Sequence, residues 1–190
     1  FERIEAAARS DAIFASNTSS IPITQVMAKV KNKSRALGAH WFNPPYLVPL
    51  VEVIQTADTD MMYIEHMIAL LKRLGKVAVH VKKDVPGFVG NRMQHAMWRE
   101  AISLVENGVC DAETIDLVVK NSFGLRLPVL GPMENADLVG TDLALDIQNV
   151  LSKELEDRHD PNPLLEKLVS EGKLGFKTNQ GFKSWTEESK

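Results

Sequence analysis

The sequence predicts an α/β portion over residues 1–85, followed by an all-α portion over residues 86–190. Up to residue 81, short apolar runs typical of strands alternate with stretches whose apolar residues recur at helical spacing. Beyond residue 87 the apolar residues follow helical spacing, and no strong strand pattern occurs. A turn-rich segment, Lys82-Lys83-Asp84-Val85-Pro86-Gly87, separates the two patterns and predicts a domain boundary.

The first portion should hold alternating helices and strands. Ser20 is the expected N-cap of the second helix, and Gly75 is the expected C-terminal cap of the third. A strand–helix–strand connection is normally parallel, whereas the short proline-rich loop after residue 42 can only join antiparallel strands. The strands are expected at 12–15, 36–42, 50–55 and 77–81, and the helices at 1–9, 21–30 and 60–74.

The second portion should consist of helices. The first, over residues 88–107, is apolar on two sides, which indicates that it packs on both. Asp111 is the expected cap of the next helix, and Pro132 is expected to open a helix that reaches about residue 157. A last helix is expected to open at Asn162-Pro163 and to end at Gly172.

His40 and Glu52 lie at the two strand ends that the short antiparallel connection brings side by side. Glu52 also stands inside an apolar run, where an ionised carboxylate is costly unless it is paired. A histidine whose second ring nitrogen is held by a carboxylate is an oriented general base. The pair therefore predicts a catalytic dyad, with a core histidine beside a strand-edge carboxylate as the structural alternative.

The composition excludes several classes of protein. The chain has 190 residues, 44% hydrophobic and 25% charged, as in ordinary globular proteins, and its net charge of −3 favours neither a nucleic acid nor a membrane partner. Cys110 is the only cysteine, so no internal disulfide forms and a reducing compartment is expected. No apolar run is long enough to span a bilayer. We expect a cytoplasmic location, or the mitochondrial matrix in a eukaryote.

Four motifs occur in a recognisable order and spacing along the chain. Together they resemble the NAD-dependent L-3-hydroxyacyl-CoA dehydrogenases, and the resemblance covers almost the whole sequence. It implies a partial Rossmann-like dinucleotide-binding domain followed by a helical domain for substrate binding and dimerisation. The motifs are Ser16-Asn17-Thr18-Ser19-Ser20, Gly38-Ala39-His40-Trp41-Phe42-Asn43-Pro44, Leu50-Val51-Glu52-Val53 and Pro86-Gly87-Phe88-Val89-Gly90-Asn91-Arg92.

The resemblance implies hydride transfer between the 3-hydroxy carbon of a 3-hydroxyacyl-CoA and NAD, in fatty-acid oxidation or related acyl-CoA metabolism. His40 matches the base that takes the hydroxyl proton, and Glu52 matches the carboxylate that orients its imidazole. Ser19 matches the hydroxyl near substrate and nicotinamide, and Asn91 matches the amide that holds the thioester end. A turn residue at Ser19 and a helix-opening hydrogen bonder at Asn91 are the structural alternatives.

Cofactor contacts and partners are implied in the same way. Asn43 and Lys177 match positions that contact NAD, as does Ser19, with a simple surface charge as the alternative for Lys177. The resemblance implies an acyl-CoA substrate and a homodimer formed through the helical domain, and no metal site is expected.

The chain departs from the family pattern at four places. Trp41 stands where phenylalanine is usual, Gly90 where a β-branched residue is commoner, and Lys183 where tyrosine is usual. The segment 131–137 is less apolar than its counterpart. The differences at Trp41, Gly90 and 131–137 leave open the acyl chain length and the requirement for CoA itself.

No G-x-G-x-x-G turn occurs in the sequence, which opens inside a predicted helix. We therefore expect the later part of a larger enzyme, inactive as it stands, and the choice between NAD and NADP does not follow from these residues. Two alternatives remain: a dehydrogenase of a small free 3-hydroxy acid, similar to carnitine dehydrogenases, and an inactive oligomerisation fragment.

Overall fold

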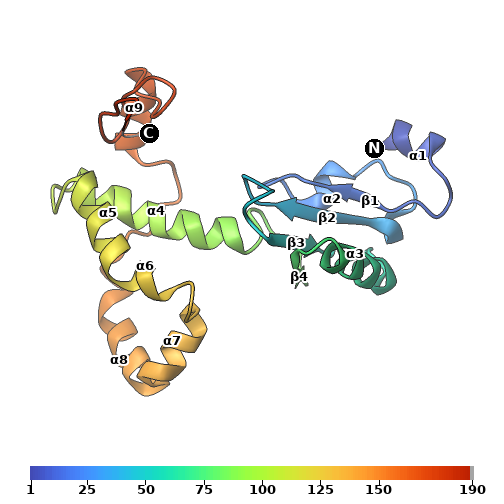
Figure 1. The fold of residues 1–190 in the computed structure, drawn as a ribbon, viewed down its shortest axis with the longest axis horizontal. Helices are drawn as coiled ribbons and strands as arrows, with labels where there is room; N and C mark the ends of the chain where they lie inside the picture. The colour runs from blue at the N-terminus through green and yellow to red at the C-terminus, as the bar shows by residue number, and fades with distance from the viewer. Residues whose placement is uncertain (189–190) are drawn as a thin grey trace. The chain divides into compact units, whose positions relative to one another are not determined.

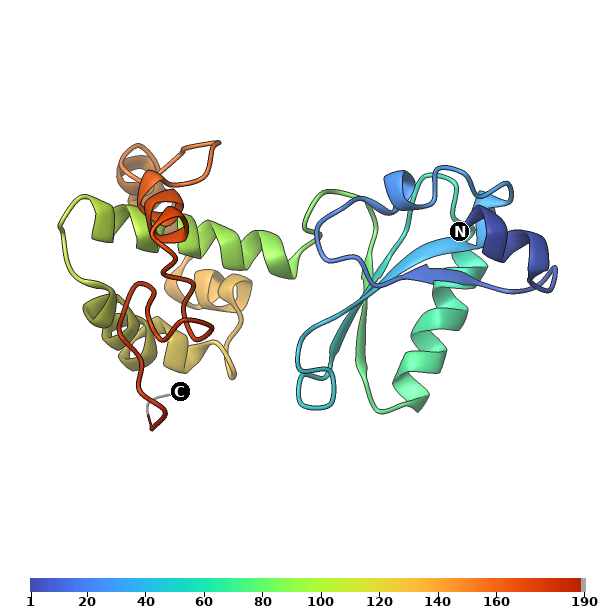
Figure 2. The ribbon, with the colours of Figure 1, turned by 90° about the horizontal axis from the view of Figure 1, so that it is seen from above.

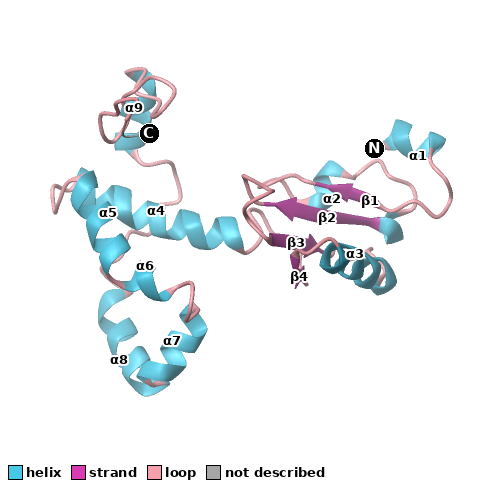
Figure 3. Ribbon diagram, viewed as in Figure 1, coloured by secondary structure: helices cyan, strands magenta, loops and turns pink. Residues whose placement is uncertain are grey.

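The computed structural model describes residues 1–188, which form two compact units, Phe1–His95 and a second unit from Ala96 onward (Figure 1). The first unit combines a four-stranded sheet with helices, and the second is helical (Figure 3). This confirms the predicted class, an α/β portion followed by an all-α portion. No helix of residues 1–188 combines the length and apolar character needed to cross a bilayer.

The mixed sheet of the first unit has the strand order β1-β2-β3-β4. β1 pairs with β2 in parallel, β2 with β3 antiparallel, and β3 with β4 in parallel, as the loop lengths predict. The elements are α1 (Glu2–Ala7), β1 (Phe14–Ser16), α2 (Ile23–Val26), a 3-10 turn (Lys33–Arg35), β2 (Ala36–Trp41), β3 (Leu50–Ile54), α3 (Met61–Arg73) and β4 (Val77–Val81).

Alternation of side chains along the strands gives the sheet two apolar faces. Figure 2 shows α3 lying along the sheet, where Ile64 and Leu71 pack on Leu37, Val51 and Val53. The other face of the sheet carries α2 and a second cluster of buried side chains, which includes the ring of Phe88. That second cluster consists of Phe14, Ile23, Met27, Val30, Ala36, Ile54, Val81 and Phe88.

The start of α2 differs from the prediction. Ser20 does not cap this helix, because Pro22 is the N-cap residue and makes no side-chain bond. The carboxylate of Asp84 accepts hydrogen bonds from the backbone N–H groups of Ile23 (3.0 Å) and Thr24 (2.8 Å) instead. A carboxylate at a helix N-terminus satisfies the same free N–H groups as a local cap. This contact also ties the segment before α4 to the loop after β1.

Up to residue 188, the second unit contains the end of α4 and five further helices. One predicted helix is wrong in extent: the pattern over residues 132–157 forms two helices, because Gly140 has a φ of 103° and interrupts the chain. Asp111 and Asn162 cap their helices as predicted. The helices are α4 (Gly90–Glu106), α5 (Ala112–Asn121), α6 (Phe123–Arg126), α7 (Pro132–Val139), α8 (Thr141–Leu151) and α9 (Pro163–Ser170).

A carboxylate also fastens α1 to the segment that leads into β2. Glu5 accepts hydrogen bonds from the backbone N–H groups of Lys31 (2.7 Å) and Asn32 (2.9 Å), and it lies 3.6 Å from the buried guanidinium of Arg35. The backbone bond from Lys31, followed by that from Asn32 and the charge of Arg35, lowers the pKa of Glu5 below its ordinary value of 4.5. The ionised carboxylate is therefore the form that holds α1 in place.

Replacing Glu5 with glutamine should lower stability most at neutral pH. A carboxyl group with a lowered pKa in the folded state stabilises above its ordinary pKa, and this contribution is lost as the pH falls through the lowered value. Urea midpoints of the wild type and Glu5→Gln should therefore differ at pH 7 and converge below pH 4.5. Glu2→Gln, in the same helix, is the matched control. A difference that does not change with pH would contradict the assignment.

Candidate active site

His40 and Glu52 face each other across the antiparallel pair of β2 and β3. The Nδ1 atom of His40 lies 2.8 Å from Oε2 of Glu52, which confirms the predicted hydrogen-bonded pair. Both side chains are buried, with exposed fractions of 3% and 1%. The register explains the contact, because directly opposed residues project to the same face of a sheet.

The second carboxylate oxygen of Glu52 is also occupied. Oε1 accepts hydrogen bonds from the backbone N–H groups of Val89 (3.0 Å) and Gly90 (2.9 Å), at the start of α4. The free N–H groups and dipole of a helix N-terminus favour a negative charge. These two donors were not predicted, because backbone N–H groups leave no residue-type signal in a sequence.

The partners of Glu52 determine the tautomer of His40. An ionised carboxylate only accepts hydrogen bonds, so Nδ1 of His40 donates to Oε2 of Glu52 and carries a proton. The other ring nitrogen, Nε2, then presents its lone pair in the neutral imidazole. No described residue forms a hydrogen bond with Nε2. The imidazole is therefore arranged to accept a proton from a bound molecule.

Two aromatic rings flank the imidazole. The centroid of Phe42 lies 4.6 Å and that of Phe88 5.5 Å from the centroid of His40. Phe88 is 1% exposed and has a φ of 51°, in the left-handed region that is costly for a bulky residue. The strained residue directly precedes the two N–H groups that bind Glu52. The segment 88–90 thus places the ring of Phe88 beside His40 and the first N–H groups of α4 beside Glu52.

Ser19 and Asn91 are brought to the same region. The side-chain amide of Asn91 donates a 2.7 Å hydrogen bond to the carbonyl of Ser19, and Gly87 donates its backbone N–H to the carbonyl of Ser20. Asn91 follows Gly90 directly, so it sits one residue from the contact with Glu52. All four predicted catalytic residues, Ser19, His40, Glu52 and Asn91, therefore lie in the first unit around the start of α4.

The carboxyl ends of the parallel strands β1 and β2 carry the polar groups suited to a nicotinamide. Ser19 and Asn43 are exposed there, and the side-chain oxygen of Asn17 accepts a hydrogen bond from the backbone N–H of Trp41 at 2.9 Å. Hydroxyl and amide groups can bind the carboxamide of a nicotinamide, so these residues fit that half of NAD. Through its bond to Trp41, Asn17 joins the two strand ends, a contact that was not predicted. Lys177 is exposed in the second unit, and its contact with NAD stays a prediction.

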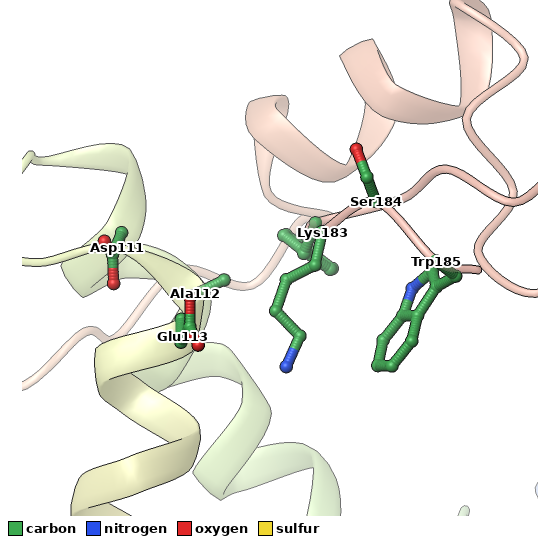
Figure 4. A pocket seen from close by; sticks show the side chains of 7 residues that line it. Asp111, Ala112, Glu113, Lys183, Ser184 and Trp185 are labelled. Atoms are coloured by element: carbon green, nitrogen blue, oxygen red, sulfur yellow. The ribbon is translucent and has the colours of Figure 1, made fainter. Parts of the chain in front are cut away.

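A separate pocket of about 450 Å³ lies in the second unit, between the start of α5 and the C-terminal segment (Figure 4). Its lysine, Lys183, bonds to Asp116 at 2.6 Å, and its ammonium lies 4.9 Å from the ring centroid of Trp185. Lys183 is one of the departures named above, and in this structure it pairs with a carboxylate and lies beside an indole ring. The pocket lining combines charged, polar and apolar side chains, namely Asp111, Ala112, Glu113, Phe182, Lys183, Ser184 and Trp185.

Glu52→Gln should invert the tautomer of His40. The two backbone N–H groups need the carboxamide oxygen, so its NH₂ group faces Nδ1 and the proton moves to Nε2. Nitrogen-15 NMR should show Nδ1 protonated in the wild type and Nε2 protonated in the variant. His80, which pairs with Gln55, should keep its signals in both proteins. Identical His40 nitrogen shifts in the two proteins would contradict this hydrogen-bond arrangement.

Both portions of the chain match models of one protein family. Residues 1–85 match the family model described as 3-hydroxyacyl-CoA dehydrogenase, NAD binding domain, and residues 87–185 match its C-terminal domain. The 5-formyl-3-hydroxy-2-methylpyridine 4-carboxylate 5-dehydrogenase of Mesorhizobium japonicum is 38% identical over 99% of this chain. A probable 3-hydroxybutyryl-CoA dehydrogenase of Bacillus subtilis is 42% identical over 93% of it. The chain spans 61% of the length of each of these two relatives.

Solved structures agree with the sequence relatives. A crystal structure of a 5-formyl-3-hydroxy-2-methylpyridine 4-carboxylic acid 5-dehydrogenase, described as an NAD⁺-dependent dismutase, superposes with a TM-score of 0.95 and 38% identity. It covers 100% of this chain, which in turn covers 61% of that structure. The chain therefore belongs to the 3-hydroxyacyl-CoA dehydrogenase family, whose cofactor is NAD.

Proposed function

We propose that this chain is part of an NAD-dependent dehydrogenase that oxidises the 3-hydroxyl of a 3-hydroxyacyl-CoA, in fatty-acid oxidation or related acyl-CoA metabolism. The observation that carries the proposal is the buried His40–Glu52 pair, which leaves Nε2 of His40 as an oriented proton acceptor. Oxidation of an alcohol needs such a group, because the hydroxyl proton leaves as the carbon loses its hydride.

His40 takes the hydroxyl proton on Nε2 and becomes an imidazolium. Glu52 stabilises that positive charge through Nδ1, and its own charge is held by the N–H groups of Val89 and Gly90. When bound, NAD supplies the acceptor for the hydride that leaves the 3-hydroxy carbon. In the reverse direction, His40 returns the proton to the oxygen of the ketone.

Asn91 and Ser19 orient the substrate in this proposal. One amide proton of Asn91 is used by the carbonyl of Ser19, and the second remains for the carbonyl of a thioester. Ser19 follows β1, and its exposed hydroxyl can donate to the substrate oxygen. Such positioning groups raise the rate by holding the reacting carbon near the base.

A second candidate is the oxidation of a small free acid that carries a hydroxyl group. The relative from Mesorhizobium japonicum, matched over 99% of this chain, is named for a pyridine carboxylate. Proton removal by His40 is the same for both substrate classes, so the dyad supports either one.

We also propose that a second copy of this chain covers part of the helical unit. Large apolar side chains stand exposed on the described helices of this unit, which is the usual mark of an interaction surface. They include Leu117 and Val118 on α5, Leu138 on α7, and Leu143, Leu145 and Val150 on α8.

The function is tested by a substrate panel on the full-length gene product. We expect NADH-dependent reduction of acetoacetyl-CoA, and a loss of turnover of about a hundredfold or more in His40→Ala, the usual value of general base catalysis. Asp58→Ala, at an exposed turn of the same unit, is the matched control. Turnover of free keto acids alone would favour the second candidate, and unchanged turnover in His40→Ala would place the base elsewhere.

The chain of residues 1–190 should bind NAD weakly on its own. It contains no glycine-rich turn whose backbone N–H groups could bind the pyrophosphate, and the nicotinamide end alone offers only a few polar contacts. Calorimetry should therefore give a dissociation constant well above the micromolar range. Micromolar binding to this chain would contradict the prediction.

A further inference from the structure

Gly90 leaves a gap at the start of α4, and the ring of Phe42 fills it. A Cβ atom on Gly90 would lie 2.4 Å from Cζ and 3.0 Å from Cε1 of Phe42. Carbon atoms pack at about 3.5 Å or more, so any side chain at position 90 would push the ring away by roughly 1 Å.

The backbone of residue 90 does not itself require glycine. Gly90 is not among the residues with a positive φ, and it opens a helix of 17 residues, where alanine is favoured over glycine. Its backbone N–H donates to Glu52, a bond that any residue except proline can make. Glycine is needed here for the space that it leaves, and the side chain that uses the space is Phe42.

Phe42 stands between this gap and the proposed base. Its centroid lies 4.6 Å from that of His40 at an angle of 52° between the rings, while Phe88 contacts the imidazole at 5.5 Å. Phe88 is buried, whereas Phe42 is only half-buried and depends on the gap at Gly90 for its place.

We propose that Phe42 is a positioning residue for His40, and that Gly90 fixes it by leaving room for its ring; this rests on the proposed role of His40 as the base. Glu52 holds one edge of the imidazole through Nδ1, and the ring of Phe42 limits its tilt. A residue with a side chain at position 90 moves Phe42 and so loosens the direction of Nε2.

NMR tests the contact without substrate or cofactor. The ring current of Phe42 acts on the imidazole protons of His40, which are identified among the five histidines by their loss in His40→Gln. We expect Gly90→Ala, Gly90→Val and Phe42→Leu all to shift these protons and to leave those of His80 in place. Gly90→Ala adds one methyl group, so it retains the fold if valine does not. Unchanged His40 shifts in Gly90→Ala would overturn the proposal.

Kinetics on the full-length gene product test the positioning role. Gly90→Val should lower kcat about tenfold or more, with a change in KM of about twofold or less, because a displacement near 1 Å costs catalysis more than binding. In the double variant Gly90→Val/Phe42→Leu, kcat should equal that of Phe42→Leu alone, because the smaller side chain removes the clash. Additive losses in the double variant would show that the two residues act separately and would overturn the proposal.

The two proposals can fail independently. If the wild type oxidised no substrate of the panel, the proposed function would fail, and the NMR result would still decide whether Gly90 fixes Phe42 against His40.

Discussion

The buried carboxylate of Glu52 is the constraint on which the site depends. An ionised carboxylate away from water is stable only when its oxygens are occupied by donors. Here the donors come from β2, through His40, and from the start of α4, through Val89 and Gly90. Removing one partner of a buried pair costs about 3–5 kcal/mol. The strand register, the entry into α4 and the tautomer of the base are therefore fixed together.

Much of this arrangement follows from the sequence. The loop between β2 and β3 is too short for a crossover, so the strands are antiparallel and His40 meets Glu52. The donors on Glu52 could not be predicted, because backbone N–H groups occur at every residue except proline. The cap of α2 was predicted wrongly for a related reason. Asp84 lies about 60 residues from the helix that it caps, and local patterns carry no signal over that distance.

Three of the four departures from the family pattern have a partner among the described residues. The ammonium of Lys76 lies 5.2 Å from the ring centroid of Trp41 and also bonds to the carbonyls of Pro45 and Val48. The larger ring at position 41 thus gains a cation that also holds the loop after β2. Lys183 pairs with Asp116, and Gly90 makes room for Phe42. Trp41 and Gly90 change the packing beside the site, Lys183 changes the packing within the second unit, and the His40–Glu52 pair stays intact.

In the proposed function, the same dyad can serve more than one class of substrate. In the proposed reaction, His40 and Glu52 act only on the hydroxyl group, which a hydroxyacyl thioester and a free hydroxy acid have in common. Discrimination requires groups that contact the rest of the substrate, because only those interactions differ between the two transition states. Asn91 is placed to do this, since its free amide proton suits a neutral carbonyl, whereas a carboxylate is better matched by a cation. The amide side chain at position 91 therefore favours the thioester within the proposed function.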